Sequence, residues 1–192
     1  MRKLVYYVAV TIDGFIAGPQ GEYDFFPVPD DFVAATVENL PETLPTPARA
    51  AMGLSEAPNR RFDTVLMGRG TYEPALSQGV TSPYAQLRQI VFSRTLPPET
   101  DPAVEIVRDR DPVEVVQELK QQQGQDIWLA GGGKLAGPLL EEIDELMIKR
   151  SPRLACAGVP LFDGAFAPTP FLPVATRDFA SGISMTTYER ER

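Results

Sequence analysis

Short apolar runs alternate with stretches of helical periodicity along most of the chain. The apolar runs have the length and the β-branched and aromatic content of buried strands. They are KLVYYVAV (3–10), FDTVLMG (62–68), LRQIVFS (87–93), AVEIV (103–107), DIWLAG (126–131) and DELMIKRSP (144–152). A closing segment, residues 171–190, indicates two strands joined by a turn. The pattern predicts an α/β fold with three layers (α/β/α), a mostly parallel central sheet and an antiparallel C-terminal hairpin.

Helical signals lie between these runs. The clearest is DPVEVVQELKQQQG (111–124), where Asp111 is a candidate N-cap, a proline follows, and a glycine ends the pattern. Further helices are expected at 30–40 with Asp30 as N-cap, from 69 with Thr71 as N-cap, and at 134–143. Residues 41–60 are proline-rich and irregular, with a short helix near 48–52. We expect residues 1–192 to form a single domain that carries this insertion.

Composition excludes several classes of site. The chain has 18 Lys and Arg against 26 Asp and Glu, so its net charge is −8, which argues against nucleic-acid or anionic-membrane partners. It has no histidine and one cysteine, Cys156, so a Ser–His triad, a zinc site and an internal disulfide are not available. We expect no metal, and Cys156 to be a buried, inert thiol. The first apolar run is too short for a signal peptide, which favours the cytoplasm.

Three consecutive glycines follow the run at 126–131, in IWLAGGGKLAGPLL (127–140). The phosphate loop of ATPases does not fit, because Leu135 stands where that motif needs Ser or Thr. Gly131, Gly133 and Ala136 do fit the spacing G-x-G-x-x-A between a strand and a helix. Two interpretations remain open: the glycines allow close packing of strand and helix, or they hold a phosphate.

Two more strand ends carry basic and hydroxyl side chains. MGRGTYE follows the second run and FSRT the third. An arginine after a strand is most often a solvated surface residue. Parallel strands, however, bring their carboxyl ends to one edge, so Arg69, Arg94 and Lys134 are expected on a single rim of an acidic protein. A ligand with separated phosphates, such as NADP(H), suits that rim, because guanidinium groups bind phosphate in a bidentate manner.

With these stretches the chain resembles the dihydrofolate reductase superfamily. It is most similar to the branch that contains the reductase domain of bifunctional riboflavin-biosynthesis proteins (the RibD C-terminal-like branch) and its stand-alone relatives. The matching stretches are VAVTIDGFIAG, VLMGRGTYE, VFSRTL, IWLAGGGKLAGPLL, ELMIKRSP and GVPLF. The zinc deaminase partner of the bifunctional proteins needs His and several Cys ligands, which this chain lacks.

The resemblance implies a set of NADPH-binding residues. They are Ala9, Gly68, Arg69, Gly70, Thr71, Ser93, Arg94, Gly131, Gly132, Gly133, Lys134 and Leu135. Within this set it implies that Arg69 contacts the 2′-phosphate, that Ala9 lies beside the nicotinamide carboxamide, and that the Gly131–Gly132 bond is cis.

The resemblance also implies where the substrate lies. Asp13 is the candidate catalytic residue, at the end of the first strand, although an Asp-Gly turn explains it equally well. The substrate-side candidates are Gly14, Asp24, Phe26 and Asp31. Tyr23 and the neighbouring phenylalanines are candidates to stack on a planar ring, although simple packing explains such a cluster too.

The function that follows is an NADPH-dependent reductase that transfers a hydride to a small, heterocyclic C=N or C=O compound. The alternative is a non-catalytic protein that binds NADP(H) or another nucleotide on the same fold. A homodimer is implied by the resemblance alone.

Overall fold

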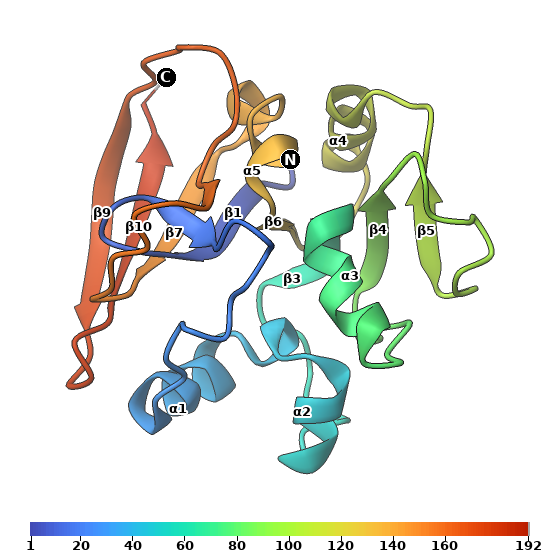
Figure 1. Cartoon of the computed structure of the whole chain (residues 1–192). Coiled ribbons are helices and arrows are strands. Elements are labelled where there is room, and N and C mark those ends of the chain that lie inside the picture. The colour runs from blue at the N-terminus through green and yellow to red at the C-terminus, as the bar shows by residue number, and fades with distance from the viewer. Residues whose placement is uncertain (192) are drawn as a thin grey trace.

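Eight strands form one sheet in the order β5-β4-β3-β6-β1-β7-β10-β9. The computed structural model describes residues 1–191, and Figure 1 shows these strands side by side. Their bounds are β1 Leu4–Val10, β3 Phe62–Gly68, β4 Arg88–Phe92, β5 Val104–Val107, β6 Asp126–Gly131, β7 Glu145–Arg150, β9 Phe171–Asp178 and β10 Ser184–Arg190. Strands β5 to β7 in this order pair in parallel, whereas β10 pairs antiparallel with both β7 and β9. The predicted fold class is therefore confirmed.

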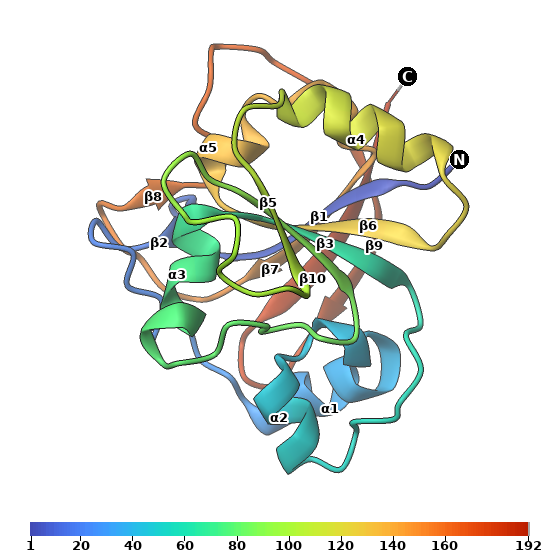
Figure 2. The same cartoon turned by 90° about the vertical axis from the view of Figure 1, so that its right-hand side faces the viewer.

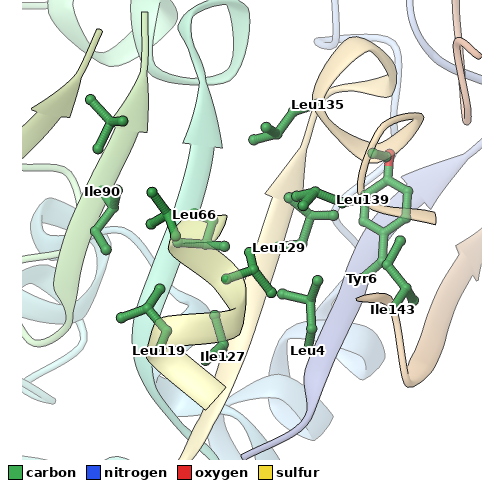
Figure 3. Close-up of a cluster of buried hydrophobic side chains, with 14 residues drawn as sticks. Leu4, Tyr6, Leu66, Ile90, Leu119, Ile127, Leu129, Leu135, Leu139 and Ile143 are labelled. Carbon is green, nitrogen blue, oxygen red and sulfur yellow. The ribbon is translucent and has the colours of Figure 1, made fainter. Parts of the chain in front are cut away.

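Helices cover both faces of this sheet, as Figure 2 shows. Helices α4 (Pro112–Gln121) and α5 (Gly133–Ala136) lie on one face. On the other lie α1 (Asp30–Asn39), α2 (Thr46–Ala51) and α3 (Arg69–Ser77). Because side chains alternate along a strand, Leu4 packs into the cluster under α4 while Val5 packs into the opposite one. Figure 3 shows the first cluster, where Leu119 and Leu135 meet the strands.

Several helix boundaries differ from the sequence prediction. Asp111 does cap α4, because its side chain accepts a hydrogen bond from the Val113 amide at 2.8 Å. The N-cap of α1 is Pro29 and that of α3 is Gly68, so neither Asp30 nor Thr71 caps a helix. The helix expected at 134–143 stops at Ala136 and is followed by a 3₁₀ turn, Leu140–Glu142. Gly137 and Pro138 interrupt it, since both residue types disfavour helix interiors.

Two further segments gain structure from tertiary contacts. The segment GVPLF contains β8 (Val159–Pro160), which pairs with β2 (Phe15–Ala17) in a small second sheet. The insertion at 41–60 begins with a 3₁₀ turn, Pro41–Thr43, and is organised by Glu42. This fully buried carboxylate accepts hydrogen bonds from the amides of Arg60, Arg61 and Phe62, at 3.2, 2.8 and 2.9 Å. It thereby fixes the start of β3.

Candidate functional site

A large cleft runs along the carboxyl ends of β3, β4, β5 and β6. Its volume is about 1660 Å³, above the range of about 300–1,000 Å³ that is usual for one drug-sized ligand. Open α/β sheets bind ligands at this edge, because the loops that follow parallel strands converge there. The cleft therefore has room for a dinucleotide together with a second small molecule.

Eleven of the twelve residues predicted to bind NADPH line this cleft. They are Gly68, Arg69, Gly70, Thr71, Ser93, Arg94, Gly131, Gly132, Gly133, Lys134 and Leu135. The exception is Ala9. Its neighbour Val8 lines the cleft instead, because successive side chains of β1 point to opposite faces of the sheet. The tertiary structure thus brings the three separate sequence segments together.

The cleft is basic although the protein is acidic. Five cationic side chains line it, Arg69, Arg94, Arg108, Arg110 and Lys134, against two carboxylates, Asp109 and Asp111. Within residues 1–191, the side chains of Arg94 and Lys134 have no hydrogen-bond or ion-pair partner. Two unpaired cations at one rim are suited to a multiply charged anion.

Arg69 lies at the start of α3 and is held near the cleft by polar contacts. Its guanidinium donates to the Thr95 hydroxyl at 2.7 Å and pairs with Glu73 at 2.9 Å. The first turn of α3 has no side-chain cap, so its amides are available to an anion. A Cβ added at Gly70 would meet no atom within 4 Å, so the surface beside these amides is open.

The three glycines after β6 have different structural roles. Gly131 has φ +132°, a conformation that L side chains rarely adopt, and the Gly131–Gly132 bond is cis, as expected. A Cβ at Gly133 would lie 2.2 Å from the backbone oxygen of Pro160, so this glycine allows close packing against β8. The packing interpretation therefore applies to Gly133, and all three glycines line the cleft, while the phosphate interpretation stays a prediction.

Asp13, the candidate catalytic residue, is not among the residues that line the cleft. Its exposed carboxylate accepts hydrogen bonds from the Thr11 hydroxyl at 2.6 Å and from the Cys156 amide at 2.7 Å. The Ala155 amide donates as well, at 3.1 Å. The Thr11 hydroxyl, followed by these amides, lowers the pKa of Asp13. This geometry fastens the 151–157 loop to the end of β1 and matches the turn interpretation.

The other substrate-side candidates also lie outside the cleft lining, and they are Gly14, Asp24, Phe26 and Asp31. The Asp31 carboxylate accepts from the Ser181 amide at 3.3 Å, in the turn between β9 and β10. Phe26 packs on Phe25, with ring centroids 4.5 Å apart. Tyr23 does line the cleft. The prediction for Cys156 is wrong: its thiol is exposed, on the loop that Asp13 holds.

Sequence analysis missed several residues of the cleft. Arg108 and Arg110 follow the end of β5 closely, much as Arg94 follows the end of β4, so the pattern VRDRD indicated the same kind of site. Ala48 and Tyr84 also line the cleft, from α2 and from the segment before β4. No motif marks them, because they reach the cleft only through the packing of α2 against residues 82–86, where the Thr46 amide donates to the Pro83 oxygen at 2.7 Å.

A second, smaller cavity of about 360 Å³ lies between α1 and the sheet, lined by Tyr7, Phe32 and Met185 among others. Beside Phe32 lies Lys149, which is only 8% exposed. Burial lowers its pKa. Its Nζ lies 4.1 Å from the centroid of the Phe32 ring and donates to the backbone oxygen of Pro27 at 3.4 Å, and within residues 1–191 no carboxylate pairs with it. Lys149 is therefore a buried cation that sequence analysis did not single out.

Two features are absent from residues 1–191. No helix there is long and apolar enough to cross a membrane. No group of three or more His, Cys, Asp or Glu side chains in that range could hold a metal ion.

Comparison with known proteins places the chain in a family. The model of the RibD C-terminal domain matches residues 2–182. YwjB of Bacillus subtilis (strain 168), described as uncharacterized, is 28% identical over 186 residues, which cover 96% of both proteins. A putative riboflavin biosynthesis protein from Shewanella sp. PV-4 has a similar structure, with a TM-score of 0.70, 27% identity and complete coverage of both chains.

The fold extends to dihydrofolate reductase. The enzyme from Enterococcus faecalis, complexed with NADP(H) and RAB-propyl, superposes with a TM-score of 0.67 over 99% of this chain and 97% of that one. The two are 16% identical, so this likeness shows the fold alone. On the family match over nearly all of its length, the chain belongs to the RibD C-terminal domain family.

Proposed function

We propose that this protein is an NADPH-dependent reductase of a small C=N or C=O compound. The observation that carries the proposal is the cationic rim of the cleft, where Arg94 and Lys134 have no partner within residues 1–191. A chain with net charge −8 concentrates cations there, beside the uncapped start of α3. An anionic ligand at this rim would offset the repulsion between the cations.

The residues present fit NADPH along the whole rim. Arg69 would bind the 2′-phosphate, and Ser93 and Arg94 would line the adenosine end. The backbone from Gly131 to Lys134 would hold the pyrophosphate. When bound, NADPH supplies a hydride to an acceptor carbon, and the protein's task is to orient the two reactants.

Two measurements test the proposal. Equilibrium titration should show tighter binding of NADPH than of NADH, since only NADPH carries the 2′-phosphate. NADPH consumption is then followed with dihydropterins, aminopyrimidines, iminium compounds and cyclic carbonyl compounds. Equal affinity for the two cofactors would contradict the assignment of Arg69. Normal NADPH binding with no consumption across the panel would favour the non-catalytic binding protein.

A further inference from the structure

Charge is unevenly distributed in the cleft. Its seven charged lining residues all follow the ends of β3, β4, β5 and β6, and they are Arg69, Arg94, Arg108, Asp109, Arg110, Asp111 and Lys134. The rest of the lining, toward β2 and α2, includes a group without charge that we call the bay. Its members are Ile16, Ala17, Tyr23, Pro45, Ala48 and Tyr84.

Structural contacts place the bay beside β6 and β1. The Tyr84 ring packs edge-on against Trp128 of β6, with centroids 5.0 Å apart. The Trp128 indole in turn donates to the backbone oxygen of Tyr7 in β1, at 3.0 Å. Ile16 lies against the glycine turn after β6, 3.7 Å from where a Cβ of Gly132 would be. The bay therefore adjoins the backbone from Gly131 to Lys134, which is proposed to hold the pyrophosphate, on the side away from Arg94 and Arg108.

We propose that the bay binds a flat, uncharged ring compound with a carbonyl or imine group, and that this class is the hydride acceptor of the reductase. That the bound compound accepts a hydride rests on the proposed function, but the class of ligand follows from the bay itself. A phosphate or carboxylate placed there would lose its hydration without meeting a cation, which is costly. Aromatic and proline side chains instead offer flat apolar surface to a ring.

Two hydroxyl groups supply the polar contacts. Neither the Tyr84 nor the Tyr23 hydroxyl has a hydrogen-bond partner within residues 1–191. Burial raises the pKa of Tyr84 to about 12, so its hydroxyl is a neutral donor near neutral pH. A neutral donor suits a carbonyl oxygen or an imine nitrogen.

The charged residue of α2 does not alter this picture. Arg49 is 2% exposed and donates to the backbone oxygens of Pro41 and Ala57, at 2.8 and 2.7 Å. Its guanidinium is therefore hydrogen-bonded within the insertion, and Arg49 does not line the cleft. The side of α2 that lines the cleft presents Pro47 and Ala48.

The test compares two compounds that share the isatin ring and differ by one anionic substituent, isatin and isatin-5-sulfonate. Each is titrated into the full chain by calorimetry, with and without NADP⁺. Trp128 is the only tryptophan in the chain, so quenching of its fluorescence reports binding next to Tyr84. We expect isatin to bind at least about tenfold more tightly, and Tyr84→Phe to weaken isatin by roughly 2- to 12-fold, the value of one neutral hydrogen bond. Equal or tighter binding of the sulfonate would overturn the inference.

A substitution that adds charge gives the converse test. Ala48→Arg should reverse the preference in favour of the sulfonate. If this variant does not fold, as judged by its thermal melt, Pro47→Lys adds a cation at a more exposed position of α2. An unchanged preference in a folded variant would show that the ligands bind elsewhere.

The two proposals fail in different ways. NADPH binding is followed separately, through the fluorescence of its own ring. If NADPH binds and isatin does not, the bay assignment is wrong and the reductase proposal stands. If isatin binds and NADPH does not, the ligand class stands and the reductase proposal is wrong.

Discussion

Replacing Arg69 with alanine tests the cofactor assignment most directly. The guanidinium lies at the start of α3 on the cleft wall, where it is bound to Thr95 and Glu73. If it contacts the 2′-phosphate, Arg69→Ala should weaken NADPH and leave NADH nearly unchanged, because NADH has no phosphate at that position.

The structure sets the expected size of the effect. Hydrogen bonds to charged groups contribute about 1.5–3 kcal/mol. To make them, the side chain must leave its i,i+4 pair with Glu73, and such pairs contribute about 0.3–0.5 kcal/mol at a surface. The net loss is about 1–2.5 kcal/mol, which corresponds to a roughly 5- to 60-fold rise in the Kd for NADPH. Because Arg69 is 48% exposed in its side chain, the effect should shrink as salt is added.

The chain offers a matched control in Arg88→Ala. The Arg88–Glu105 and Arg69–Glu73 ion pairs both have an N···O distance of 2.9 Å. The side chains of Arg88 and Arg69 are 47% and 48% exposed. Arg88 does not line the cleft. Titrations of wild type and both variants with both cofactors complete the experiment. Equal weakening of NADPH and NADH in Arg69→Ala, or the same change in Arg88→Ala, would refute the reasoning.

Three further predictions follow from contacts described above. Gly133→Ala should lower the free energy of unfolding in urea by roughly 1–3 kcal/mol, because its Cβ would collide with Pro160, whereas Gly70→Ala should not destabilise the fold. Burial lowers the pKa of Lys149 from 10.5, so wild-type stability should rise as the pH rises toward that value and the charge is lost. Lys149→Met has no amine to titrate, so its free energy of unfolding in urea should not show this rise between about pH 7 and about pH 10. At about pH 7 the variant should be more stable than wild type. Asp13→Ala should leave NADPH affinity unchanged and speed amide hydrogen exchange at Ala155 and Cys156; a lost affinity with unchanged exchange would restore Asp13 to the site.

The elements that sequence predicted well are those specified by local chemistry. The strand at 62–68 is apolar and bounded by polar residues, and it forms β3 at the same bounds. The cap of α4 depends only on Asp111 and the amide two residues later. The helix expected at 134–143 fails because its apolar pattern continues past Gly137 and Pro138, which break the helix, and Gly137 also packs closely against the backbone of Asp163. Hydrophobic periodicity shows which side of a helix is buried, but it does not show where the helix ends.

The cationic rim of the cleft was accessible to sequence analysis for the same reason. The carboxyl ends of parallel strands meet at one edge whatever their side chains are, so Arg69, Arg94 and Lys134 could be placed together from their positions after strands. Asp13 shows the limit of that argument. It also follows a strand, β1, but its carboxylate turns toward the 155–156 amides, and those lie far along the chain.

By itself, the sequence determined the strands of the main sheet, the absence of histidine, and the concentration of cations at one edge. Each of these depends on residue type or on spacing within a single element. Only the tertiary structure decided that Gly133 packs against Pro160, that Asp13 fastens a loop, and that Ala48 and Tyr84 belong to an uncharged bay. Those features arise where segments distant in sequence pack together, and the contacts made there leave no periodic signal in either segment.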